Sequence, residues 1–142
     1  MIRLFRSIVI CTMVLAVGCT YPFKNSPPTS VSEAAGEPLT EDRVKAAILA
    51  AGRQTPIQWD MDEVKPGLIR ANLNFKYKHK ITLNIPYSTR SYQLVYVDSQ
   101  LMRYEPPLGR GETARIGGKY LLWVKQLDEE IKANLKAAAA AS

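Results

Sequence analysis

The side chains that most often carry out catalysis are few in this chain and are not spaced so as to act together. The single histidine, His79, stands between Lys78 and Lys80, where two cations would repel a metal ion. A nucleophilic serine needs a neighbouring base, and the sequence places no acidic residue beside His79 to orient its ring. We therefore expect His79 to be solvent-exposed near a hairpin tip, and we expect no metal and no other cofactor.

Paired carboxyl groups are the remaining route to catalysis. Two carboxyl groups about 5 to 9.5 Å apart across a groove can cleave a glycosidic bond. The acidic residues that would have to meet in such a groove are Asp60, Asp62, Asp98 and Glu105. Acidic residues near strand ends are more often solvated than catalytic, so an enzyme is the alternative and not the preferred interpretation.

A basic run is the most distinctive polar feature of the sequence. Lys76, Lys78 and Lys80 alternate with Tyr77 and His79, and Arg70 precedes them on the same predicted face. Arg70, Lys76, Lys78 and Lys80 would form a patch for an anionic partner such as lipid head groups or lipopolysaccharide cores. The alternative is a solvated sheet face whose lysines discourage edge-to-edge pairing.

The N-terminus reads as an export signal that ends in a cysteine. Arg3 and Arg6 precede an apolar run, residues 8–17, of roughly ten residues, and a membrane-spanning helix needs about 20. The sequence Ala16-Val17-Gly18-Cys19 resembles the lipobox of bacterial lipoproteins, with alanine at the position where leucine is usual. The resemblance implies that residues 1–18 are removed and that Cys19 becomes the mature N-terminus, acylated by fatty acids such as palmitate. An ordinary secretory signal cut near Gly18, or an uncleaved anchor, is the alternative.

Lipoprotein sorting also implies a location. The residue after Cys19 is Thr20 and not the aspartate associated with inner-membrane retention, so we expect the periplasmic face of the outer membrane. Inner-membrane anchoring or a soluble periplasmic protein is the alternative. Cleavage leaves 124 of the 142 residues and lowers the net charge from +6 to +4, because Arg3 and Arg6 are removed with the leader. Cys11 leaves too, so no disulfide can form, and export makes nucleic acid an unlikely partner for the domain.

The mature chain begins with a segment that shows no regular period. Residues 19–39 contain four prolines among small and polar residues, and we predict a lipidated cysteine followed by a flexible tether. Residues 40–136 form the predicted single domain, which begins with a helix over 41–51 that has Thr40 as its N-cap and Gly52 as its C-cap. A second helix starts near Gly118, and residues 137–142 are an alanine-rich tail.

Period-two alternation between the helices predicts four strands. Apolar and polar residues alternate around Ile57–Met61, over residues 69–78, over residues 81–85 and over residues 91–97, with short connections. Residues 98–115 are a long loop. One apolar sheet face and two amphipathic helices predict an α+β fold, a two-layer sandwich in which an antiparallel meander of about four strands carries both helices on one face.

The complete chain resembles small envelope lipoproteins of Gram-negative bacteria, on the evidence of the lipobox, the tyrosine-rich strands and the closing helix with Tyr120 and Trp123. That resemblance brings no activity with it. The sequence favours a lipid-anchored, periplasmic, non-catalytic binding or envelope-structural module. Its partners would be the membrane through Cys19 and an anionic envelope component or a protein. A hydrolase of envelope polymers that uses acidic residues is the alternative.

Overall fold

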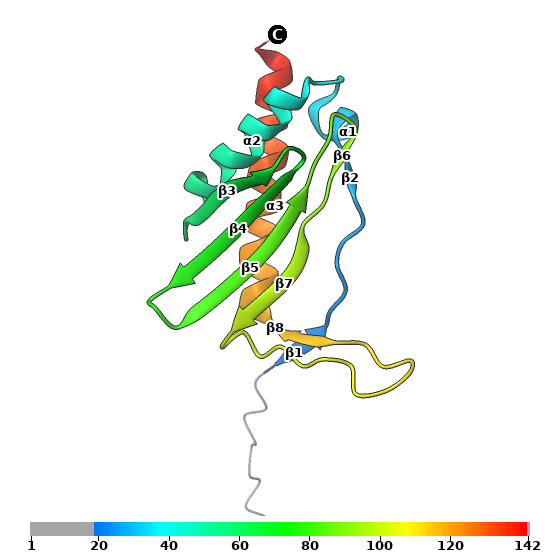
Figure 1. Cartoon of the computed structure of the whole chain (residues 1–142), viewed down its shortest axis with the longest axis vertical. Coiled ribbons are helices and arrows are strands. Elements are labelled where there is room, and N and C mark those ends of the chain that lie inside the picture. The colour runs from blue at the N-terminus through cyan, green and yellow to red at the C-terminus, as the bar shows by residue number, and fades with distance from the viewer. Residues whose placement is uncertain (1–18, 142) are drawn as a thin grey trace, which may run out of the picture.

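The computed structural model describes residues 19–141; the predicted signal peptide, residues 1–18, and Ser142 lie outside the described residues. An antiparallel sheet forms one layer and two long helices form the other (Figure 1). The sheet consists of β3 (Trp59–Lys65), β4 (Leu68–Phe75), β5 (His79–Pro86) and β7 (Val95–Gln100). The long helices are α2 (Glu41–Gln54) and α3 (Gly118–Ala140). The shorter elements are β1 (Thr20–Pro22), β2 (Thr29–Ser30), α1 (Val31–Ala35), β6 (Ser91–Tyr92) and β8 (Arg115–Gly117).

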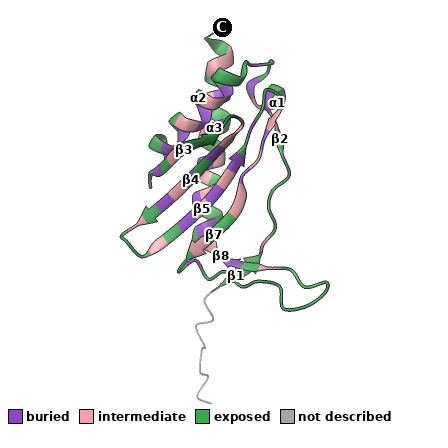
Figure 2. Cartoon of the chain, in the orientation of Figure 1, coloured by how far each residue is buried: buried purple, intermediate pink, exposed green. Residues whose placement is uncertain are grey.

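The sheet confirms the predicted α+β fold class and the antiparallel meander. Its strands are neighbours in the order β3-β4-β5-β7. Leu73 on β4 lies opposite Trp59 on one side and Ile81 on the other, so the apolar rows continue from strand to strand. Because side chains alternate along a strand, the polar residues that alternate with these apolar residues lie on the other face of the sheet, toward solvent (Figure 2). The strand predicted over 91–97 is divided, since β6 leaves the main sheet and pairs with β2.

Both long helices cover the apolar face of the sheet. The predicted stripe of α2 is buried, and Thr40 caps this helix by accepting a hydrogen bond from the Arg43 N–H. The two helices also contact each other, and the Asn134 amide on α3 donates to the Ala47 carbonyl at 3.0 Å. The alanine-rich tail is not a separate segment, because α3 runs through it to Ala140.

The predicted end of α2 at Gly52 is wrong. The helix continues to Gln54, and Thr55 is its C-cap. Gly52 is buried inside the helix, where a Cβ would lie 2.9 Å from the Trp59 carbonyl oxygen and 3.0 Å from Met61 Cγ. Glycine is used here so that β3 can approach the helix closely, and not to end the helix.

The segment expected to be a flexible tether packs against the rest of the domain. β1 pairs with β8, β2 pairs with β6, and α1 lies against α3. Val31, Ala35 and Leu39, spaced four residues apart, are buried in the same core as the sheet and the long helices. β1 ends at Pro22 and α1 ends at Gly36, which has a left-handed φ of 86°, so the breakers shorten these elements but do not prevent them. The domain therefore begins at Thr20 and not at residue 40.

Candidate functional site

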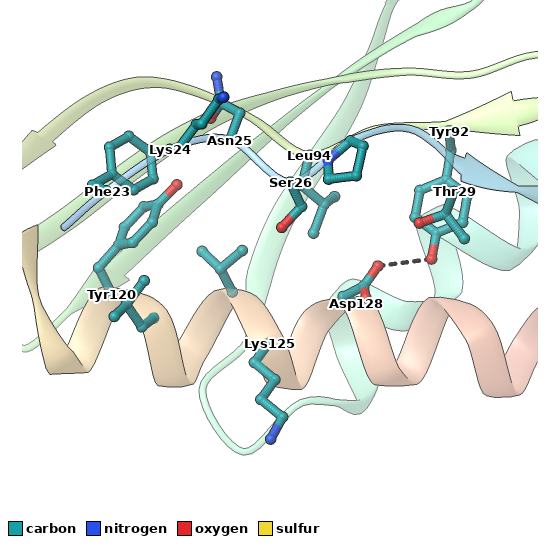
Figure 3. Close-up of a pocket in the computed structure, with 13 residues that line it drawn as sticks. Phe23, Lys24, Asn25, Ser26, Thr29, Tyr92, Leu94, Tyr120, Lys125 and Asp128 are labelled. Carbon is teal, nitrogen blue, oxygen red and sulfur yellow. Dashed lines mark hydrogen bonds between the residues drawn. The ribbon is translucent and has the colours of Figure 1, made fainter. Parts of the chain in front are cut away.

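A groove between the N-terminal segment and α3 is the most distinct cavity for a ligand (Figure 3). We call residues 23–29 the strap; they form one wall, Tyr92 and Leu94 form the back, and α3 forms the floor. The groove has a volume of about 190 Å³. At roughly 30 Å³ per water molecule this is the space of about six waters. It is too small for a whole cofactor, since ligand sites usually measure about 300–1,000 Å³, but it can take one apolar group.

The strap is held in place by its backbone and by one aromatic side chain. The Phe23 N–H donates to the Ala114 carbonyl at 2.7 Å, and the Asn25 side chain accepts from the Tyr96 N–H at 3.0 Å. The Phe23 ring meets three tyrosines edge-on, at centroid distances of 5.3 Å to Tyr120, 5.4 Å to Tyr96 and 6.3 Å to Tyr104. Such edge-on contacts are favourable beyond the area that they bury. The wall of the groove is therefore fixed by the fold.

A tyrosine and an aspartate form the polar end of the groove. The Tyr92 hydroxyl donates to Asp128 Oδ1 at 2.7 Å, and Asp128 Oδ2 pairs with Lys132 Nζ at 2.9 Å (Figure 3). Burial, and then the hydrogen bond to Asp128, raises the pKa of Tyr92 well above its ordinary value. The phenol therefore stays neutral and donates a hydrogen bond to a carboxylate that already has Lys132 as a second partner. This pair can fix a structure or orient a ligand, but neither group is poised as a nucleophile or a base.

Apolar side chains and two lysines complete the lining. Tyr120 and Val124 project from α3 toward Leu94, and together they make the floor apolar. Lys24 on the strap and Lys125 on α3 also border the groove, and their side chains extend away from it on opposite sides (Figure 3). Lys125 is only loosely paired with Glu129, at 3.8 Å on an exposed surface. An apolar floor with cations at its rim suits an amphipathic molecule that has a negatively charged end.

Cys19 is exposed at the end of the molecule where β1 begins. It lines a shallow depression together with Leu101 and Lys119. Thr20, the next residue, is already paired with Gly117. A group attached to the Cys19 sulfur would therefore lie directly against the folded domain.

The four residues of the predicted basic patch do not form one cluster. Arg70 lies on the outer face of β4, where its Nε donates to Asn84 Oδ1 at 3.2 Å. Lys80 is opposite Asn74, four residues further along β4, which is roughly 13 Å away at about 3.4 Å per residue. Lys76 and Lys78 belong to the β4–β5 turn. The structure thus separates Arg70 from the three lysines, which gather at the hairpin.

The acidic residues do not meet in a groove. Asp60 is opposite Asn72, Asn72 is opposite Thr82, and Thr82 is opposite Asp98, so these four residues form a row across the outer sheet face. Asp60 and Asp98 lie on the two edge strands, three strand spacings or about 14 Å apart. That separation exceeds the roughly 9.5 Å limit of glycoside-cleaving pairs. Between them Thr82 donates to Asn72 at 2.9 Å.

Asp62 lies two residues or about 7 Å from Asp60 on the same face of β3, so these two carboxyl groups stand side by side on one strand and do not face each other across a groove. Asp62 is opposite Arg70 on the outer face, and Glu105 lies in the loop after β7, where its backbone pairs with Arg115. Within residues 19–141 no group of three or more histidine, cysteine or acidic side chains is arranged to hold a metal ion.

His79 differs from its expected exposed position. It is half-buried, its ring lies beside Phe75 and Trp123, and its Nδ1 is 3.1 Å from the Leu101 carbonyl oxygen. The contact comes from the fold, because Leu101 and Trp123 are 22 and 44 residues away in the chain. His79 therefore joins the hairpin to the loop after β7 and does not stand free in solvent.

Sequence reasoning did not identify the Tyr92–Asp128 pair. The sequence around Asp128 indicates only an i,i+4 ion pair with Lys132, which the structure contains, and the alternation around Tyr92 indicates only an apolar strand face. No local pattern joins residues 36 positions apart. The sequence feature that could have indicated a buried partner for Asp128 is its position on α3 among the apolar positions 124, 127 and 131.

Comparisons with known protein families, with curated proteins and with solved structures found no match to this chain. No helix in the described part of the chain is both long and apolar enough to cross a membrane.

Proposed function

We propose that this chain is a lipid-anchored, non-catalytic binding module of the bacterial envelope, and that the groove under the strap is its binding site. The observation that carries the proposal is the lining of the groove: an apolar floor, a neutral tyrosine held by a carboxylate, and two lysines at the rim. Such a lining favours an amphipathic, anionic envelope molecule whose apolar group enters the groove. Its charged end would remain outside the groove, on the side of Lys24 or on the side of Lys125.

The anchor in this proposal is Cys19. It is supported by the lipobox-like sequence before it and by the exposure of its side chain at one end of the domain. Thr20 in place of aspartate favours the periplasmic face of the outer membrane. Replacing Cys19 with alanine should leave unprocessed precursor and abolish labelling by a radioactive fatty acid. Labelling that persists in this variant would refute the anchor, and membrane fractionation tests the location.

The groove is tested by filling it. Val124 lines the groove, whereas Leu122 lies on the same helix and is exposed to solvent. We expect Val124→Trp to abolish binding of a short alkyl phosphate measured by calorimetry, and Leu122→Trp to leave it unchanged. Both variants should remain folded by circular dichroism.

The same pair of variants tests the natural ligand. A component of envelope extracts captured by the wild type and by Leu122→Trp, but lost with Val124→Trp, would be the ligand of the groove. Equal binding by all three proteins would show that the groove is not the site.

A further inference from the structure

Exposed apolar side chains gather at the end of the molecule that carries Cys19. Among residues 19–141, nine large apolar side chains are exposed. Six of them lie in β1, in the β4–β5 turn, in β7 and in the loop that follows it: Tyr21, Tyr77, Val97, Leu101, Tyr104 and Leu108. Single exposed apolar residues need no explanation, but a gathering at one end marks an interaction surface.

Two protrusions flank β1 at this end (Figure 1). One is the tip of the β4–β5 hairpin and the other is the loop of residues 101–114. Cys19, His79 and Leu101 line one depression, which connects the two protrusions to the start of the chain. We call Cys19, the hairpin tip (residues 76–78) and this loop the basal surface.

The fold turns apolar residues of the basal surface outward. Leu101 and Arg103 both have a left-handed backbone, with φ of 55° and 57°, and Met102 between them is buried. Left-handed φ is uncommon for residues other than glycine. The Gly117 N–H donates to the Met102 carbonyl at 2.9 Å and fixes this turn. As a result Leu101 is 66% exposed.

The hairpin tip shows the same feature. Lys76 and Tyr77 are left-handed, with φ of 54° and 59°, at turn positions where asparagine and glycine are usual. Tyr77 is 90% exposed between two lysines, and Leu108 on the other protrusion is also 90% exposed. A tyrosine between lysines is typical of the interface between lipid head groups and acyl chains.

The basal surface carries an excess of positive charge. Arg103, Arg110 and Lys119 are exposed on or beside the basal surface and form no ion pair with any residue in the described range. Glu105 and Glu112 lie in the same loop, and Glu112 accepts a hydrogen bond from the Leu108 N–H. Cations still exceed acids there, because Lys76 and Lys78 add two positive charges to those of Arg103, Arg110 and Lys119.

The opposite end carries charges of both signs, since Arg43 follows its acidic run directly and the backbone of Arg90 is bonded to Val31 at the start of α1. Residues 31–42 contain four acidic residues and no lysine or arginine: Glu33, Glu37, Glu41 and Asp42. They lie in α1, in the turn after it and in the first turn of α2, far from β1 (Figure 1). A negatively charged plane would therefore attract the basal end, where cations exceed acids, more strongly than the other end.

We propose that the basal surface docks on an anionic phospholipid bilayer, with Tyr77 and Leu108 in the head-group region and the cations against lipid phosphates. The proposal rests on the proposed lipid anchor, because Cys19 lies on the surface that faces the bilayer. The domain then stands with the sheet and α3 rising from the membrane and with the strap groove beside it.

The test measures how deeply chosen residues enter the bilayer. The mature lipidated chain carries Tyr77→Cys, Leu108→Cys or Val64→Cys, and a nitroxide is attached to the new thiol. Val64 is the matched control, since it is 52% exposed near the other end of β4. In vesicles of phosphatidylethanolamine and phosphatidylglycerol, we expect labels at 77 and 108 to collide mainly with oxygen dissolved in lipid. The label at 64 should collide mainly with a water-soluble nickel complex.

Charge is tested in the same vesicles. Replacing Arg103, Arg110 and Lys119 together with glutamine should move the label at 108 into water, as should about 1 M salt, where the screening length is about 3 Å. Replacing Arg53, Lys65 and Lys136 with glutamine removes the same charge from exposed positions elsewhere and should change nothing. Immersion in phosphatidylcholine vesicles equal to that in anionic vesicles would refute the assignment to anionic lipid. Labels at 77 and 108 in water, like the label at 64, would refute docking.

Failure of the anchor gives a different result. A Cys19 thiol that still reacts with the label shows that no lipid is attached. Flotation of that unlipidated chain with anionic vesicles, but not with phosphatidylcholine vesicles, would still support docking, and no flotation with either would overturn it.

Discussion

The hydrogen bond from Tyr92 to Asp128 joins the strand side of the groove to α3. Tyr92 is 1% exposed, and its hydroxyl reaches Asp128 Oδ1 at 2.7 Å. Because a buried hydroxyl without a partner is costly, this contact fixes β6 against the helix. In the described residues every buried side-chain nitrogen and oxygen has a hydrogen-bond partner, so such contacts are consistently made.

Removing the Tyr92 hydroxyl should destabilise the protein. Hydrogen bonds to charged groups contribute about 1.5 to 3 kcal/mol, and Asp128 keeps Lys132 as a partner. We therefore expect Tyr92→Phe to lower the free energy of unfolding in urea by about 1.5 kcal/mol. Tyr87→Phe removes the hydroxyl of another tyrosine, one for which the structure shows no side-chain hydrogen bond among the described residues, and should change this free energy by less than about 0.5 kcal/mol. Equal losses would contradict the assigned role of the hydrogen bond.

Tyr92 and Tyr120 should also make the protein sensitive to alkali. Burial raises the pKa of both phenols above the ordinary value of 10.0. Below about pH 10 the folded and unfolded states both hold these protons. Above it only the unfolded state releases them, so stability falls as pH rises. We expect the urea midpoint to decrease above pH 10, and to decrease less in Tyr92→Phe. An equally steep decrease of the midpoint with pH in the variant and in the wild type would contradict this.

The sequence predicted part of the residue-scale picture. Period-two alternation correctly placed Arg70 on the solvent face, but it could not show that Lys76 and Lys78 belong to a turn. A turn of lysine and tyrosine with left-handed φ has no glycine or asparagine to reveal it. The groove depends on contacts between residues 23–29, 92–94 and 120–128, which no local pattern relates.

The strap is the segment for which the structure differs most from the sequence prediction, which made it part of a flexible tether. It lies against the domain through Phe23, Asn25 and the gathered tyrosines. The long helices and the main strands were predictable because each has at least six residues and repeats its pattern. β1, β2 and α1 have three, two and five residues, too few for a period to be recognised.

Phe23→Ala tests whether the strap is part of the domain. A fully buried phenylalanine changed to alanine costs about 3–5 kcal/mol, and Phe23 is half-buried, so we expect a loss of about 2 kcal/mol in urea unfolding. Lys24→Ala is the matched control, since Lys24 is the next residue and is exposed. A flexible tether would predict no effect from either change.

Gly52→Ala tests the close approach of α2 and β3. Helix propensity alone favours alanine by about 1 kcal/mol. The new Cβ would lie 2.9 Å from the Trp59 carbonyl oxygen, and overpacking costs about 1–3 kcal/mol. We expect Gly52→Ala to lower the stability of the protein in thermal unfolding. Ala50→Gly at an exposed position of the same helix is the control, and it should cost about 1 kcal/mol, the usual difference in helix propensity. Stabilisation by Gly52→Ala would show that β3 can move away.

At the scale of the whole molecule, the absence of a free tether determines how the domain sits. Within residues 19–141 only Cys19 precedes β1, and β1 pairs with β8, which leads directly into α3. A lipid on Cys19 would therefore be connected to the longest helix through one hydrogen-bonded ribbon. If Cys19 carries the proposed lipid, the anchor, the basal surface and α3 would move as one rigid unit, and the groove would stay at a constant height above the bilayer.

Limited proteolysis distinguishes this arrangement from a tethered domain. Lys24 is the first basic residue after Cys19, and a flexible tether would be cut there by trypsin. In the structure the bonds of Phe23 to Ala114 and of Asn25 to Tyr96 hold both neighbours of Lys24, so the chain cannot easily enter a protease. With the lipidated chain on vesicles, we expect mass spectrometry to detect little soluble fragment beginning at Asn25. Phe23→Ala should release this fragment much faster, because it loosens the strap. Rapid release from the wild type would show that residues 19–39 are a tether after all.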